Sequence, residues 1–212
     1  MNLSKGSASL EPKKELWNSF LENFFAELIE ISKAGSLSAF WHTSSKNRTE
    51  TYMGSVLSEV AKKLKKDLDF KVEHYTYDIA FRKKSPSQKH PIPLVVIESE
   101  NWPFVAHHEV RKLLSIAAPL KILITCGTWS KEQYPEVAFA NKMLADWKVV
   151  IDEHLDVLEE YNIGDTGFLA FLVGECGSDS ILRFYSFNYN CFSRIFEDFK
   201  TREIGKCVKP EL

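Results

Sequence analysis

Apolar residues recur at helical spacing in four segments of the chain, and each segment is predicted to form an amphipathic helix. In the first, residues 12–32, the apolar positions are Leu16, Trp17, Phe20, Phe24, Leu28 and Ile31. The other three predicted helices cover residues 51–66, 103–117 and 134–160. Residues three or four apart share one side of a helix, so each segment has an apolar face to bury.

Six other segments have the pattern of β-strands: residues 70–76, 77–83, 92–99, 120–126, 168–173 and 181–187. Polar and apolar residues alternate in the second, which is typical of a strand with one buried face. The third and fourth are almost continuously apolar, as in central strands that are covered on both faces. The polar residues 83–91 predict a turn, and the sequence GECGSDS predicts a hairpin turn before the last strand.

This order of elements, α-α-β-β-β-α-β-α-β-β, predicts an α/β fold in which helices flank a mixed central sheet. A chain of 212 residues is long enough for one well-buried domain and short for two. We therefore expect a flexible polar segment over residues 1–10, a single domain over residues 11–212, and a loop at residues 35–49.

Composition and charge indicate which partners and which cellular compartment are expected for this protein. The formal net charge is -2, so any contact with nucleic acid must come from local basic patches. No apolar run approaches the roughly 18 residues of a membrane helix, and the first residues lack the apolar stretch of a secretory signal. The scattered cysteines, Cys126, Cys176, Cys191 and Cys207, are interpreted as reduced thiols, which favours a cytoplasmic protein.

Three acidic residues are expected to converge at one end of the most hydrophobic strand. If the turn after the second strand is centred on Gln88, then Asp78 and Glu98 pair directly, with Cβ atoms about 5 Å apart. Glu100 follows Glu98 by two residues, so it projects from the same face of the sheet. Carboxylates this close raise one another's pKa, so the cluster needs compensation.

A divalent cation is one form of compensation, because Mg²⁺ takes one or two carboxylates together with water molecules. The backbone carbonyl of Ser99 and the side chains of Glu59 and Glu109, on the flanking helices, are further candidate ligands. The alternative is that the acids at the strand end are solvated or are paired with nearby lysine and arginine side chains.

The segment that carries Glu59, Asp78 and the sequence Glu98-Ser99-Glu100 resembles the αβββαβ core of the PD-(D/E)XK, or restriction-endonuclease-like, nuclease superfamily. The resemblance covers about residues 51–126. The predicted N-terminal helix, and the long helix and β-hairpin that follow residue 126, are additions to this core. The resemblance implies that Asp78 and Glu98 bind Mg²⁺ or Mn²⁺, and that Glu59 matches an acid that some members carry on the first core helix.

Glu100 departs from the family, which usually has lysine at this position. A minority of restriction enzymes carry E-x-E, as this chain does. Glu100 is therefore expected either to act as a base or further ligand, or to mark a site without activity. Lys112, on the third predicted helix, is a candidate for a migrated catalytic lysine, and the alternative is an ordinary solvated lysine.

The resemblance predicts a metal-dependent DNA endonuclease, and a homodimer because a duplex has two strands to cut. The alternatives are an inactive nuclease-like binding or regulatory module and a hydrolase of another phosphate substrate. The candidate DNA-binding residues are Lys62, Lys63, Lys66, Arg82, Lys83 and Lys84, although such basic runs are commonly solvated surfaces. Trp102, directly after the acidic strand, is expected to pack against the protein rather than to stack on a base.

Overall fold

A computed structural model describes residues 4–35, 51–64, 68–74, 77–83, 93–163 and 167–207. Its helical elements are α1 (Ser4–Lys33), the π-helical segment η1 (Thr51–Val56), α4 (Leu57–Leu64), α5 (His107–Leu114) and α6 (Ala140–Glu160). Its strands are β1 (Leu68–His74), β2 (Tyr77–Lys83), β3 (Pro93–Glu100), β4 (Leu120–Cys126), β5 (Phe168–Cys176), β6 (Ile181–Asn190) and β7 (Ile195–Lys206). Apart from their first residues, the loop expected at 35–49 and the turn expected at 83–91 lie outside the described residues.

All seven strands form one sheet, in which they lie side by side in chain order. Strands β1, β2 and β3 are antiparallel, β3, β4 and β5 are parallel, and β5, β6 and β7 are again antiparallel. Helices α5 and α6 connect the parallel strands, because parallel neighbours need a crossover rather than a tight turn. The predicted mixed sheet and α/β class are confirmed.

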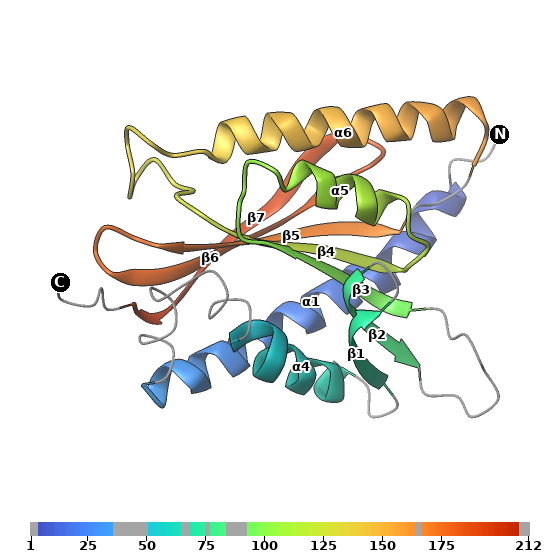
Figure 1. Ribbon diagram of the computed structural model, residues 1–212. Helices are drawn as coiled ribbons and strands as arrows, with labels where there is room; N and C mark the ends of the chain where they lie inside the picture. The colour runs from blue at the N-terminus through green and yellow to red at the C-terminus, as the bar shows by residue number, and fades with distance from the viewer. Residues whose placement is uncertain are drawn as a thin grey trace.

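The helices form a layer on each face of this sheet (Figure 1). Helices α1 and α4 pack on one face, where Phe20 and Phe24 belong to the same apolar core as Ile97 of β3. Helices α5 and α6 pack on the other face, where Trp147 shares a second core with Val96 of β3. Neighbouring strand residues point to opposite faces, so β3 contributes side chains to both cores.

Strand β7 was not predicted, because its exposed residues lack a clear apolar pattern. Most of its side chains are exposed, and it lies at the edge of the sheet, so it does not need the apolar faces of a central strand. It is held by backbone pairing with β6 along nearly its whole length. Pairing between strands depends on backbone groups, which every residue except proline supplies.

Helix α6 begins at Ala140 rather than at Tyr134. The residues before it fold back across the end of the sheet: the Tyr134 hydroxyl donates to the Cys176 carbonyl, and the Phe139 N–H donates to the Thr128 carbonyl at 3.0 Å. Pro135 also disfavours a helical conformation at the residue before it. The other end differences are that α1 begins at Ser4 and that α5 covers only His107–Leu114.

The expectation that all four cysteines are reduced is wrong for two of them. Cys176, the last residue of β5, forms a disulfide with Cys207, the residue after β7. This bond connects the middle of the sheet to its outer strand across 31 positions of sequence. In the described part of the chain, no helix combines the length and the apolar character that crossing a bilayer requires.

Candidate functional site

Strands β2 and β3 pair in the register that the sequence predicts. The observed pairs include Ile79 with Ile97 and Ala80 with Val96, and the same register continued by one residue places Asp78 opposite Glu98. The two acids are further connected through the backbone, because the Ser99 N–H donates to Oδ2 of Asp78 at 2.7 Å. The observed strand pairing therefore supports the expected juxtaposition of Asp78 and Glu98.

Glu98 is buried beneath helix α5. It follows Val96 by two residues on β3, so both project toward the layer formed by α5 and α6. The exposed fraction of its side chain is 0%. Its Oε2 accepts a hydrogen bond from Lys112 of α5 at 2.7 Å, whereas its Oε1 has no hydrogen-bond partner among the residues that the structure describes. One oxygen of a buried carboxyl group is therefore left unsatisfied, which is energetically costly.

The electrostatics of this pair follow from its burial. Burial raises the pKa of the Glu98 carboxyl to about 8, and the hydrogen bond from Lys112 opposes this rise without cancelling it. Burial lowers the pKa of the Lys112 ammonium, but its hydrogen bond with Glu98 and the charge of that residue outweigh burial and raise the pKa. Glu109 approaches Lys112 at 3.3 Å, so the ammonium group lies between two acids.

Glu100 makes a backbone contact that its position in the sequence did not predict. Its Oε1 accepts a hydrogen bond from the backbone N–H of Trp102 at 2.6 Å. This contact fixes the start of the loop that leads from β3 into α5. Glu100 is therefore engaged in holding the backbone beside the site, while Lys112 provides the positive charge next to Glu98.

In the described residues, no contact connects Glu59 with Asp78 or Glu98. It lies on α4, which packs on the opposite face of the sheet from α5, and it forms an ion pair with Lys62 at 2.5 Å. Lys63, on the same helix, is paired with Glu27 of α1. Arg82 is half-buried near the end of β2, the neighbouring Lys83 is exposed, and Lys66 and Lys84 lie outside the described residues.

Thr125 belongs to this region and was missed in the sequence. It pairs with Glu100 across β3 and β4, and it follows Leu123 by two residues, so it faces the same core as α5. It is fully buried, and its hydroxyl oxygen has no hydrogen-bond partner within the described part of the chain. The signal in the sequence was a single hydroxyl residue near the end of an otherwise apolar strand.

Asp78 and Glu98 suit a hard divalent cation, such as Mg²⁺, that binds few protein ligands. Within the described residues, no group of three or more His, Cys, Asp or Glu side chains gathers as a metal site. Two carboxylates with water completing the shell are nevertheless a usual set for Mg²⁺. Asp78 and Glu98 supply these two carboxylates, and the Oε1 of Glu98, which is buried and has no hydrogen-bond partner in the described residues, is the candidate donor atom.

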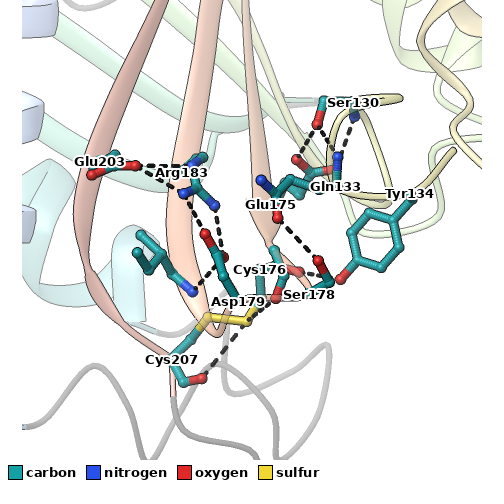
Figure 2. Close-up of polar contacts among 12 residues, drawn as sticks. Ser130, Gln133, Tyr134, Glu175, Cys176, Ser178, Asp179, Arg183, Glu203 and Cys207 are labelled. Atoms are coloured by element: carbon teal, nitrogen blue, oxygen red, sulfur yellow. Dashed lines mark hydrogen bonds and ion pairs between the residues drawn. A yellow bond between two sulfur atoms is a disulfide. The ribbon is translucent and has the colours of Figure 1, made fainter.

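A second buried acid, Glu175 at the end of β5, has a structural role (Figure 2). Its carboxylate accepts hydrogen bonds from the backbone N–H groups of Trp129 and Ser130, from the Ser130 hydroxyl at 3.1 Å and from the Tyr185 hydroxyl at 2.7 Å. These donors satisfy it fully, in contrast to Glu98. Glu175 therefore fixes the loop after β4 next to the Cys176–Cys207 disulfide.

Comparison of the sequence with models of known protein families gives no match, and comparison with curated proteins gives none either. The functional conclusion therefore depends on the side chains themselves: Asp78 and Glu98 on neighbouring strands, and Lys112 from the helix above them.

Proposed function

We propose that this protein is a metal-dependent DNA endonuclease with a PD-(D/E)XK-like core, in which the catalytic lysine comes from helix α5. The order α4-β1-β2-β3-α5-β4 and the helix layers on both faces support this core. The observation that carries the proposal is the contact at 2.7 Å between Lys112 and the buried Glu98, on the strand beside Asp78.

In this proposal Asp78 and Glu98 hold Mg²⁺ or Mn²⁺. When bound, such an ion lowers the pKa of a coordinated water and neutralises charge on the phosphodiester oxygens. Lys112 adds a fixed ammonium group, which stabilises negative charge that develops on the phosphate during displacement. Burial and the anchoring β-strands keep Glu98 in place, and the pairing with Glu98 and Glu109 keeps Lys112 directed at the acids.

Glu100 is a positioning residue in this scheme. Because its carboxylate holds the Trp102 N–H, it orders the loop that begins helix α5 and so helps to place Lys112. The position usually occupied by lysine has a structural acid, and the positive charge is supplied one element later in the chain.

Plasmid cleavage in Mg²⁺ or Mn²⁺ tests the proposal. We expect nicking or linearisation by the wild-type protein, and loss of at least about 100-fold in rate for Asp78→Asn, Glu98→Gln and Lys112→Met. Lys206→Met is the matched control, because Lys206 is exposed at the end of the distant edge strand β7. Wild-type protein without metal-dependent cleavage, or cleavage that survives in Asp78→Asn, would contradict the proposal.

A binding module without activity is favoured by one observation: Lys112 already pairs with Glu98, so charge compensation does not require a cation. The two candidates differ in their response to metal. A nuclease should melt at a higher temperature in millimolar Mn²⁺, because a ligand of the native state stabilises it, and Glu98→Gln should lose this gain. An inactive module should show no such gain in either protein.

A further inference from the structure

Trp102 is a large aromatic residue that the fold leaves exposed directly beside the candidate site. Its exposed fraction is 65%, whereas Trp17, Trp129 and Trp147 are each at most 5% exposed. The expectation that it packs against the protein is therefore wrong. An exposed indole is costly for a soluble protein and is a common element of binding sites.

The backbone around Trp102 is well fixed, so its exposure is a property of an ordered turn. Its N–H donates to Glu100, and its carbonyl accepts from the Val105 N–H at 3.0 Å. The Ala106 N–H donates to the Pro103 carbonyl at 3.3 Å, and the His108 N–H to the Val105 carbonyl at 3.0 Å. These bonds span three residues, and in such a turn side chains three apart lie above one another.

This turn aligns Trp102 with Val105, His108 and Arg111 in one row, which the helical spacing of α5 continues. Val105 is 39% exposed, and His108 and Arg111 are both exposed. From Trp102 to Arg111 the row is about 15 Å long, at 1.5–2 Å per residue. It therefore begins with an aromatic ring beside the acidic strand and ends with the guanidinium group of Arg111.

The charges around this row favour a polyanion. The row itself contains no acid and has the cation of Arg111, whereas Lys112, the next residue on α5, is paired with Glu98 and Glu109. Lys142 of α6 lies over the Phe104 ring at 5.3 Å, which adds a cation near the start of the row. The nearby acids are engaged, Glu100 with the Trp102 N–H and Glu109 with Lys112.

We propose that this row binds unpaired nucleotides of a DNA strand, with a base stacked on Trp102 and the phosphates following His108 and Arg111. This proposal rests on the proposed function and specifies its substrate as DNA with a single-stranded segment. Aromatic stacking together with a basic track is the usual means of binding single strands. A row of about 15 Å is long enough for only a few nucleotides of a strand.

The proposed DNA-binding row on α5 lies elsewhere than the basic residues that the sequence indicated as candidate DNA contacts. Lys62 and Lys63 lie on α4, on the face of the sheet opposite α5, and each is paired with a glutamate. The row on α5 instead lies on the same side of the sheet as Glu98. A strand bound there would lie next to Lys112.

Binding of a fluorescein-labelled 12-nucleotide oligothymidylate to the full chain in EDTA, followed by anisotropy, tests this inference. Stacking on an aromatic side chain contributes roughly 1–3 kcal/mol per base, so Trp102→Ala should raise the Kd about 5- to 150-fold. Trp102→Phe should stay within about threefold of the wild type, because a ring is retained. Tyr161→Ala is the control, since Tyr161 is equally exposed, at 67%, but lies after the end of α6.

Arg111→Ala should weaken binding and reduce the slope of log K against log salt by about 0.7, as expected for one lost phosphate contact with a single strand. The inference is overturned if the wild type does not bind, if Trp102→Ala binds as tightly as the wild type, or if Tyr161→Ala is equally weakened. Tighter binding of an oligouridylate of the same length would overturn the assignment to DNA.

The outcomes separate this inference from the proposed function. Binding that depends on Trp102, without cleavage in Mg²⁺ or Mn²⁺, would support the nucleotide-binding row and contradict the nuclease. Cleavage that depends on Asp78 and Glu98, with oligonucleotide binding unaffected by Trp102→Ala, would support the nuclease and overturn the row.

Discussion

The ammonium group of Lys112 lies 2.7 Å from a carboxylate oxygen of Glu98, although the two residues belong to different elements and are 14 positions apart. Glu98 is fully buried, so this contact is its main electrostatic support. Helix α5 and strand β3 are thus joined by a charged contact as well as by the apolar core around Val96 and Val110.

Removing Lys112 should lower the free energy of unfolding most at a pH at which Glu98 is ionised. The pKa of Glu98 is about 8 beside Lys112, and it rises further without Lys112. At pH 9 Lys112→Met must therefore either bury the carboxylate without its partner or protonate it, and we expect a loss of up to about 3–5 kcal/mol in the free energy of unfolding. At pH 6 the carboxyl group takes up a proton in the folded state, so the loss should be smaller. Urea unfolding in EDTA at both pH values measures the difference.

The double variant Glu98→Gln/Lys112→Met should recover most of the stability lost at pH 9, because it removes the buried charge together with its partner. Lys33→Met is the control: it breaks the pair with Glu30, in which both side chains are 67% exposed, and should cost less than about 1 kcal/mol. Equal losses for Lys112→Met and Lys33→Met would contradict the assigned importance of the pair.

The register of β2 and β3 was predictable, because antiparallel pairing is fixed once the centre of the turn is known. From Phe81 to Ile79 the observed pairs follow this geometry, and the same register continued by one residue places Asp78 opposite Glu98, whereas a register shift between Phe81 and Arg82 interrupts it closer to the turn. Strands β2 and β4 also have the predicted ends, since their apolar patterns stop sharply. Strong local patterns were therefore sufficient for the central sheet.

Features that depend on contacts distant in the chain were not predictable in the same way. Lys112 contacts Glu98 only because the crossover connection places α5 over β3. Glu100 accepts a hydrogen bond from the backbone N–H of Trp102, and a contact with a backbone group leaves no pattern in the sequence. Cys207 follows β7, a strand without an apolar pattern, so its proximity to Cys176 could not be derived from spacing. These contacts are set by tertiary structure rather than by local propensity.

Lys121 on β4 should reduce stability near neutral pH. It is 1% exposed, with a single hydrogen bond of 3.4 Å to the Leu114 carbonyl, and burial lowers its pKa to about 8. The unfolded pKa is higher, near 10.5, so the folded state disfavours the charged form below pH 8. This penalty, on the order of 3 kcal/mol, should disappear as the pH rises from about 8 to about 10.5.

Lys121→Met therefore should be more stable than the wild type at pH 7, and the difference should shrink as the pH approaches 10.5. Urea unfolding across this range measures it, with the exposed Lys131→Met as a control that should show no such trend. A difference between Lys121→Met and the wild type that is independent of pH would show that the buried charge is not its cause.

Glu175 should stabilise the protein by holding the loop after β4 in its folded conformation. Glu175→Leu removes the acceptor of two backbone N–H groups and two hydroxyl groups, and we expect a loss of about 3–5 kcal/mol in the free energy of unfolding. Glu175→Gln keeps one acceptor oxygen and should lose less. Glu203→Gln, which affects a 62% exposed acid paired with Arg183, is the control and should change stability by less than about 1 kcal/mol. Equal losses in Glu175→Leu and Glu203→Gln would contradict this role.

The Cys176–Cys207 disulfide should stabilise the protein by restricting its unfolded chain. It closes a loop of 31 positions, for which chain entropy predicts a contribution of about 3–4 kcal/mol. Cys207→Ser should therefore melt well below the wild type in the absence of reductant, whereas Cys191→Ser, which leaves the disulfide intact, should melt close to the wild type. Treatment with a phosphine reductant should increase the wild-type mass by two hydrogen atoms and lower its melting temperature to that of Cys207→Ser. A wild-type protein whose mass and melting temperature do not respond to the reductant would show that these two thiols are not joined in solution.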